Sequence, residues 1–271
     1  MSQIYFDSNF FNRRLAGLDT VALATDCNAR DLQWCFSEEL LFELFDSIKA
    51  GNREARDLMV QWATFCLGML PQSKLFRNSA RIVADELGRK STVPFDSDPN
   101  AAGHIRSFFS SVSEGNLPPK IGIVWRASEE IRASDEKFRL DLESFRKKGA
   151  KKLAFSEFAF IFLRRHFLTL KCEEPETRAQ EVLSDLCNYS HVRTFLLAAH
   201  KLSYERTGKG HRTDLRHLVY ATSVDLFVTD DVPTTMLAKE IFGSRPRVIM
   251  QKDFFDEIGV QSHESLHPIA G

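Results

Sequence analysis

Short apolar segments alternate with amphipathic helical patterns near both ends of the chain, and this alternation limits the fold more than any other feature. The apolar runs cover 4–6, 33–36, 225–229 and 247–250. Helical patterns near the C-terminal runs cover 214–222, 232–242 and 252–258. Strand-length apolar runs separated by helices predict a parallel sheet covered by helices. The expected fold class is therefore α/β.

The middle of the chain predicts a mostly helical insertion, roughly over 72–190, within a single domain that spans 1–271. A helical pattern before it, at 53–69, ends at Pro71. Residues 72–119 contain prolines and polar runs and predict a loop-rich segment with one or two short helices. Further helices are expected at 125–148, along the apolar stripe of Phe155, Phe158 and Phe162, and twice within 176–205.

Composition favours a protein of the cytoplasm without a membrane span. The 36 basic and 37 acidic residues nearly balance, so any nucleic-acid site has to be a local basic patch. Five cysteines without a CxxC pair suit a reducing compartment and argue against a disulfide framework or a structural zinc site. The most apolar stretch, 153–163, is about half the length of a membrane span and contains Glu157.

Acidic residues stand where strands or helices of this pattern meet loops. Asp7 follows the first apolar run, and Asp230 and Asp231 follow the run at 225–229. In an open parallel sheet the carboxyl ends of the strands form the ligand crevice, so these carboxylates are expected there. Asp214 stands just before a predicted helix, where the helix dipole favours a carboxylate. Each residue alone also fits a structural role as a turn former or helix cap.

Taken together, four segments of the chain resemble the PIN-domain family of metal-dependent nucleases. They are IYFDSN at 4–9, SEELLFEL at 37–44, DLRHLVYA at 214–221 and DLFVTDD at 225–231. The matching features are a strand followed by Asp-x-Asn, a Ser with a Glu six positions later, an Asp opening a helix, and a strand running into Thr-x-Asp. The resemblance covers roughly the first 50 and the last 65 residues, and the long middle departs from it.

This resemblance implies a PIN-like sheet and a site of four carboxylates, Asp7, Glu43, Asp214 and Asp231, which are the expected catalytic and metal-binding residues. Mg²⁺ or Mn²⁺ is the implied cofactor, because hard divalent cations prefer oxygen ligands. Asp230 competes with Asp231 or serves as an outer ligand, and Glu38 and Glu39 compete with Glu43. Asn9 and Thr229 are expected to orient the ligands through hydrogen bonds.

The function that the resemblance implies is a metal-dependent endoribonuclease, of the toxin or defence type. RNA is the implied substrate, although DNA is not excluded, and an antitoxin-type or other protein and a second copy of the chain are further candidate partners. Lys209, Arg212 and Arg216 flank Asp214 and are candidates for holding a phosphate backbone. The alternative readings are a structure-specific DNA nuclease and a PIN-like binding module without turnover. His217 either lines the site or is a structural histidine, and Lys147, Lys148, Lys151 and Lys152 form either a second basic patch or a solvated face.

Overall fold

Five short strands pair side by side in the part of the chain that the computed structural model describes, which is residues 1–11, 18–37, 40, 43, 53–89, 93–96, 99–116, 152–205 and 211–259. The strands are β1 (Ser2–Phe6), β2 (Leu32–Phe36), β3 (Lys74–Leu75), β4 (Leu226–Thr229) and β5 (Arg247–Met250). Their order across the sheet is β3-β2-β1-β4-β5, and every neighbouring pair is parallel. The expected α/β class is confirmed.

Four of these strands coincide with the apolar runs in the sequence, and β3 does not. β3 has only two residues, half-buried at the edge of the sheet beside β2. A segment of that length carries no periodic pattern, so its pairing depends on tertiary contacts. It lies within 72–190, so the residues expected to form an insertion also supply one strand of the central sheet.

Each central strand is buried on both faces and sends alternate side chains into two separate cores. In β1, Ile4 and Phe6 enter one core, whereas Tyr5 enters the other. In β4, Val228 joins Phe6 and Phe227 joins Tyr5. This alternation follows from the period of two along a strand, and burial on both faces is typical of parallel sheets.

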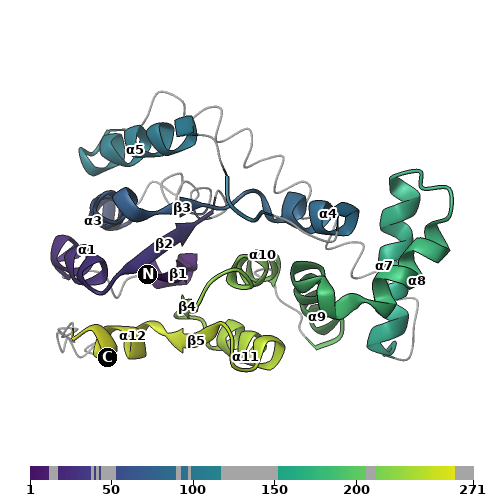
Figure 1. Ribbon diagram of the computed structural model, residues 1–271. Coiled ribbons are helices and arrows are strands. Elements are labelled where there is room, and N and C mark those ends of the chain that lie inside the picture. Colours follow the sequence, from purple (N-terminus) through teal and green to yellow (C-terminus); the bar gives the residue numbers. More distant parts are fainter. Residues whose placement is uncertain are drawn as a thin grey trace.

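Helices cover both faces of the sheet (Figure 1). One face packs against α1 (Thr20–Ala29), α3 (Arg53–Met69), α5 (Pro99–Ser113) and α12 (Gln251–Ile258). The other packs against α4 (Ser79–Arg89), α9 (Ser190–Glu205), α10 (His211–Ala221) and α11 (Val232–Phe242). Beyond α9, α7 (Phe155–Thr169) and α8 (Pro175–Ser184) form a third apolar cluster. Three single turns of 3-10 helix complete the order: η1 (Ser8–Phe11), η3 (Leu70–Gln72) and η4 (Leu186–Asn188).

The segment 72–119 contains two helices, within the one or two expected there, but these helices are longer and the loops correspondingly shorter than expected. That segment contains α4 and α5, which are 11 and 15 residues long. Ile105, Phe109 and Val112 recur at helical spacing in α5 and are buried in the core that contains α3. Packing of this apolar face outweighs the local preference of the prolines and polar residues. The helix expected at 125–148 lies outside the described residues.

Within the described parts of the chain, none of the helices is both long enough and apolar enough to cross a bilayer. All five cysteines are free thiols, three of them buried. Burial raises the pKa of the Cys27 and Cys35 thiols to about 12.

Candidate functional site

The strand order reverses between β1 and β4, and the candidate site lies at the carboxyl ends of these two strands. The chain leaves β1 through α1 towards β2 on one side and returns later to β4 on the other side of β1. Ligands in open parallel sheets bind where the strand order reverses in this way. Asp7 follows β1 here, and its backbone N–H donates to the carbonyl of Val228 in β4 at 3.2 Å. Asp230 and Asp231 follow β4, so these acidic residues lie along the same edge of the sheet as Asp7.

Asp7 is fully buried, and one of its carboxyl oxygens lacks a hydrogen bond. Its Oδ1 accepts from the Phe10 N–H at 3.1 Å, whereas Oδ2 has no partner among the described residues. The pKa of Asp7 is raised from 3.8 to about 7, mainly by burial. The nearby Glu43 carboxylate contributes to the same increase. His217 and Thr229 act in the opposite direction. Asp7 therefore lies among charged neighbours without water to solvate it.

Thr229 orients the Asp7 carboxyl group from the neighbouring strand, as the sequence predicts. Its hydroxyl oxygen accepts from the Asp231 N–H at 3.0 Å, and its side chain is fully buried. The hydroxyl hydrogen is thus available to Asp7, and this bond lowers the pKa of Asp7. Asn9, the other residue expected in such a role, lies half-buried in η1.

A chain of polar side chains holds Glu43 beside Asp7. Glu43 Oε1 lies 3.5 Å from Nε2 of the buried His217, and His217 Nδ1 lies 2.6 Å from the Tyr5 hydroxyl. The Tyr5 hydroxyl also lies 3.0 Å from Oγ of Ser37. Ser37 Oγ in turn accepts from the Leu40 N–H at 3.3 Å, as an N-cap does. β1, β2 and α10 thus contribute to fixing one carboxylate.

His217, which the sequence left open between a site residue and a structural histidine, and Tyr5, which no sequence motif singled out, are both functional candidates. His217 is a buried histidine that contacts the Glu43 carboxylate, rather than one that only fills the core. Its position three residues after Asp214 in α10 is the sequence signal, because residues three apart share a helix face. Tyr5 carries a weaker signal, the polar tip of an aromatic ring within an otherwise apolar strand.

Asp214 lies inside α10, not at its start, which corrects the expected position. The helix begins at His211, three residues earlier, because the apolar pattern that marked its start appears only from Leu215. Asp214 is therefore in the first turn, where the helix dipole still favours a carboxylate. Its side chain lies outside the described residues, and so do Glu38 and Glu39.

Asp231 fills the structural role that its position allows. It is the N-cap of α11, and its Oδ2 accepts from the Thr234 N–H at 2.7 Å. Asp230 is half-buried beside it. Both carboxylates lie at the end of β4, and the described contacts assign the cap to Asp231 alone.

The basic residues expected beside the cluster are placed only in part. Arg216 lines a mostly apolar cavity between α4, α7, α9 and α10, together with His166 and Phe162. The side chains of Arg216 and His217 therefore point in different directions from α10, as expected for consecutive residues of a helix. Lys209 and the side chain of Arg212 lie outside the described residues, as do Lys147, Lys148 and Lys151, while Lys152 is exposed.

Within the described part of the chain, no three side chains of His, Cys, Asp or Glu gather closely enough to hold a metal ion. What the described residues bring together is the pair Asp7 and Glu43, with His217 against Glu43. A buried carboxyl oxygen without a partner and a second carboxylate are donors that suit a hard cation. Comparison with known proteins finds no matching family model, curated protein or solved structure. The function has therefore to be inferred from these residues themselves.

Proposed function

We propose that the chain is a divalent-metal-dependent nuclease that hydrolyses RNA phosphodiester bonds at the carboxyl ends of β1 and β4. The observation that carries the proposal is Asp7, a fully buried carboxyl group with a raised pKa and an oxygen that no described residue satisfies. A buried carboxylate is costly unless a partner compensates it. A cation at this position would lower that cost and explain why the residue is retained in the core.

The donors around this position suit Mg²⁺ or Mn²⁺. Asp7 Oδ2 and the Glu43 carboxylate are oxygen ligands from β1 and from the segment after β2. Asp231 at the end of β4 caps α11 and does not gather with them in the described structure, so it would join the ion only after a rearrangement. Asp214 joins them in the proposal as a fourth. When bound, such an ion would supply positive charge for the phosphoryl oxygens and activate a water for attack on phosphorus.

The surrounding residues orient the ligands in this proposal. Thr229 holds the Asp7 carboxyl group from the next strand, and His217 fixes Glu43 through its Nε2. The Tyr5 hydroxyl lies 2.6 Å from Nδ1 of the same imidazole, so a hydrogen bond holds the ring at that nitrogen. Partners of this kind commonly determine the affinity of a metal site. These contacts exist before any ion binds, which reduces the reorganisation that binding requires.

Cleavage assays on an RNA and a DNA oligonucleotide of the same sequence test the proposal. RNA cleavage is expected with Mn²⁺ or Mg²⁺ and is expected to vanish with EDTA. Asp7→Asn should lower the rate by about a hundredfold or more, as the loss of one metal ligand commonly does. Asp256→Asn, which changes an exposed carboxylate of α12, is the matched control and should leave the rate unchanged.

Each alternative function has its own outcome in this assay. Faster cleavage of DNA than of RNA would support a DNA nuclease with the same metal site. RNA binding without cleavage under any metal condition would support a binding module. Full cleavage in EDTA, or in Asp7→Asn, would refute the metal-dependent mechanism.

Thermal melting with and without Mn²⁺ tests whether Asp214 belongs to the site. Asp214→Asn preserves the shape of the side chain and removes one charge, so the metal-free protein should melt at the same or a higher temperature. The stabilisation by Mn²⁺ should shrink, because a ligand stabilises only by binding the folded state. A structural Asp214 predicts the reverse, a loss of about 0.5–2 kcal/mol with an unchanged response to Mn²⁺.

A further inference from the structure

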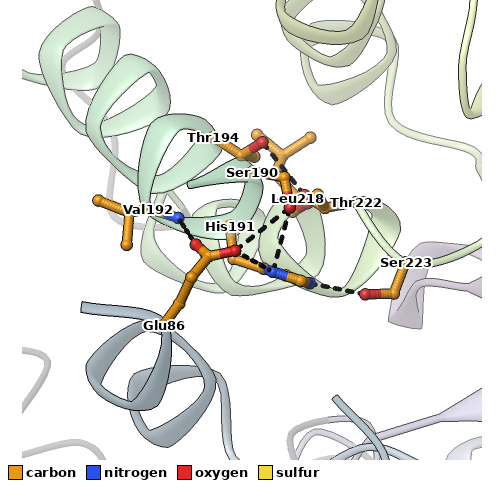
Figure 2. A network of polar contacts seen from close by, with 8 residues as sticks. All are labelled: Glu86, Ser190, His191, Val192, Thr194, Leu218, Thr222 and Ser223. Carbon is orange, nitrogen blue, oxygen red and sulfur yellow. Dashed lines mark hydrogen bonds and ion pairs between the residues drawn. The ribbon is translucent and has the colours of Figure 1, made fainter. Parts of the chain in front are cut away.

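A second polar cluster lies at the opposite edge of the sheet, near the amino ends of β1 and β4. Figure 2 shows it: Glu86 from α4, His191 from the first turn of α9, and Ser223 from the turn between α10 and β4 lie along one line of contacts. None of these residues contributes to the carboxylate cluster around Asp7. Glu86 and His191 are buried, and Ser223 is half-buried.

The contacts connect a hydroxyl, an imidazole and a carboxylate in series. Ser223 Oγ lies 2.6 Å from His191 Nε2, and His191 Nδ1 lies 3.1 Å from Glu86 Oε1. An ionised carboxylate can only accept hydrogen bonds, so Nδ1 carries the proton and Nε2 accepts from the Ser223 hydroxyl. This tautomer is the one in which a histidine can take a proton from a serine.

Glu86 is held from three directions, which keeps its carboxylate in position. Oε2 accepts from the backbone N–H of Val192 at 2.7 Å, and Oε1 accepts from the Ser190 hydroxyl at 3.3 Å as well as from His191. Val192 and Ser190 belong to the first turn of α9, where the helix dipole favours a negative charge. The orientation of the His191 ring therefore depends on a carboxylate that is itself fixed by the backbone.

Ser223 reaches a cavity of about 580 Å³, which is large enough for a small molecule. Ser190, Thr222, Arg193, Arg245 and Asp225 also line this cavity, and the Arg245 guanidinium donates to Asp225 Oδ1 at 2.8 Å. Arg193 comes from the same helix as His191, one turn from Ser190. A purely structural role explains the pair of Glu86 and His191, but it makes no use of a serine on the wall of a cavity that two arginines and one aspartate line.

We propose that Ser223, His191 and Glu86 form a nucleophilic site that hydrolyses small carboxylic esters bearing a negative charge. The Ser223 oxygen forms a bond to the ester carbonyl carbon while its proton passes to His191 Nε2. The bond from that carbon to the alcohol oxygen breaks, and the departing alcohol takes the proton from Nε2. Water then cleaves the acyl-serine, giving one proton to Nε2, which returns it to Ser223 as the acid leaves. Arg193 and Arg245 bind the negative charge of the ester.

A fluorophosphonate probe tests the nucleophile directly, because it reacts with activated serines and not with ordinary ones. The folded wild-type protein, incubated with the probe in EDTA, is expected to carry the label on Ser223 in peptide mass spectrometry. Ser223→Ala should abolish the label, and His191→Gln should slow labelling by about a hundredfold or more, the scale of a general base. Ser184→Ala, which removes an exposed hydroxyl of α8, is the matched control and should label like the wild type.

Ester hydrolysis in EDTA tests the substrate class. The monoester of succinic acid with 4-nitrophenol should be hydrolysed faster than the uncharged 4-nitrophenyl butyrate, and Arg193→Ala should remove that preference. Equal rates for both esters would refute the role of the arginines. Absence of the label from Ser223 in the wild type, or labelling that His191→Gln leaves unchanged, would overturn the site. Ser223→Ala removes only one hydroxyl group, so it remains informative even if changes at Glu86 or His191 destabilise the fold.

Discussion

Replacing Asp7 by Asn should change how the stability of the protein depends on pH. The Asp7 carboxyl group has a pKa of 3.8 when solvated and about 7 in the folded protein, chiefly because it is buried. Between these two values the unfolded chain ionises at this residue and the folded chain does not. Stability is therefore lost as the pH rises from about 4 to 7, in contrast to the usual carboxylate, whose folded pKa is depressed. Asn at this position does not ionise in either state.

The size of the effect follows from the shift. A change from 3.8 to about 7 corresponds to roughly 4 kcal/mol of destabilisation once the group is ionised in both states, near pH 8. Somewhat more than half of it, on the order of 2–3 kcal/mol, should develop between pH 5 and pH 8. The Asn side chain retains an oxygen that can accept from the Phe10 N–H, so this hydrogen bond should persist.

Urea unfolding in EDTA at pH 5 and pH 8, followed by circular dichroism, measures the difference. Titrating groups away from the site affect both proteins alike, so the gain in unfolding free energy of Asp7→Asn over the wild type reports on Asp7 and on its electrostatic coupling to Glu43 and His217. Asp256→Asn, the exposed control, should stay within about 0.5 kcal/mol of the wild type at both pH values. A gain of Asp7→Asn that is the same at pH 5 and pH 8 would show that Asp7 does not titrate in this range, and the argument from its burial would fail.

Four further substitutions test contacts of the fold and of the proposed nuclease site. Tyr5→Phe should lower the unfolding free energy by about 1–3 kcal/mol in urea unfolding, because the buried imidazole of α10 loses its 2.6 Å partner; an unchanged stability would contradict that contact. Gly68→Ala should lower the unfolding free energy by about 1–3 kcal/mol in thermal melts, because the new Cβ would lie 2.7 Å from that of Ala24. Gly103→Ala in α5 is its control, because the new Cβ would have nothing within 4 Å, and it should raise the unfolding free energy by up to about 1 kcal/mol. Asp231→Ala should lower the unfolding free energy in EDTA by about 0.5–2 kcal/mol, because the helix cap is lost, and it should also abolish RNA cleavage. If cleavage is retained, Asp231 has only the structural role of the cap.

The strands at both ends of the chain, and most of its helices, could be predicted from the sequence. α3, α11 and β5 begin and end at the expected residues, because their apolar periodicity and the flanking Pro71, Asp231 and Gly243 are local signals. α5 and β3 could not be predicted. α5 depends on an apolar face that packs against α3, and the two residues of β3 depend on β2 for their hydrogen bonds.

The sequence by itself determined which carboxylates follow strands, and therefore that Asp7 and Asp231 would lie at the carboxyl edge of a parallel sheet. Only the tertiary structure decided what surrounds them. The pKa of Asp7 depends on burial and on residues as far away in the chain as His217 and Thr229, which no local pattern encodes. The contacts of His191 with Glu86 and with Ser223 could not be predicted from the sequence either, because 105 and 32 positions separate these two pairs in the chain. Such contacts arise from helix packing, which brings side chains from distant segments within hydrogen-bonding distance.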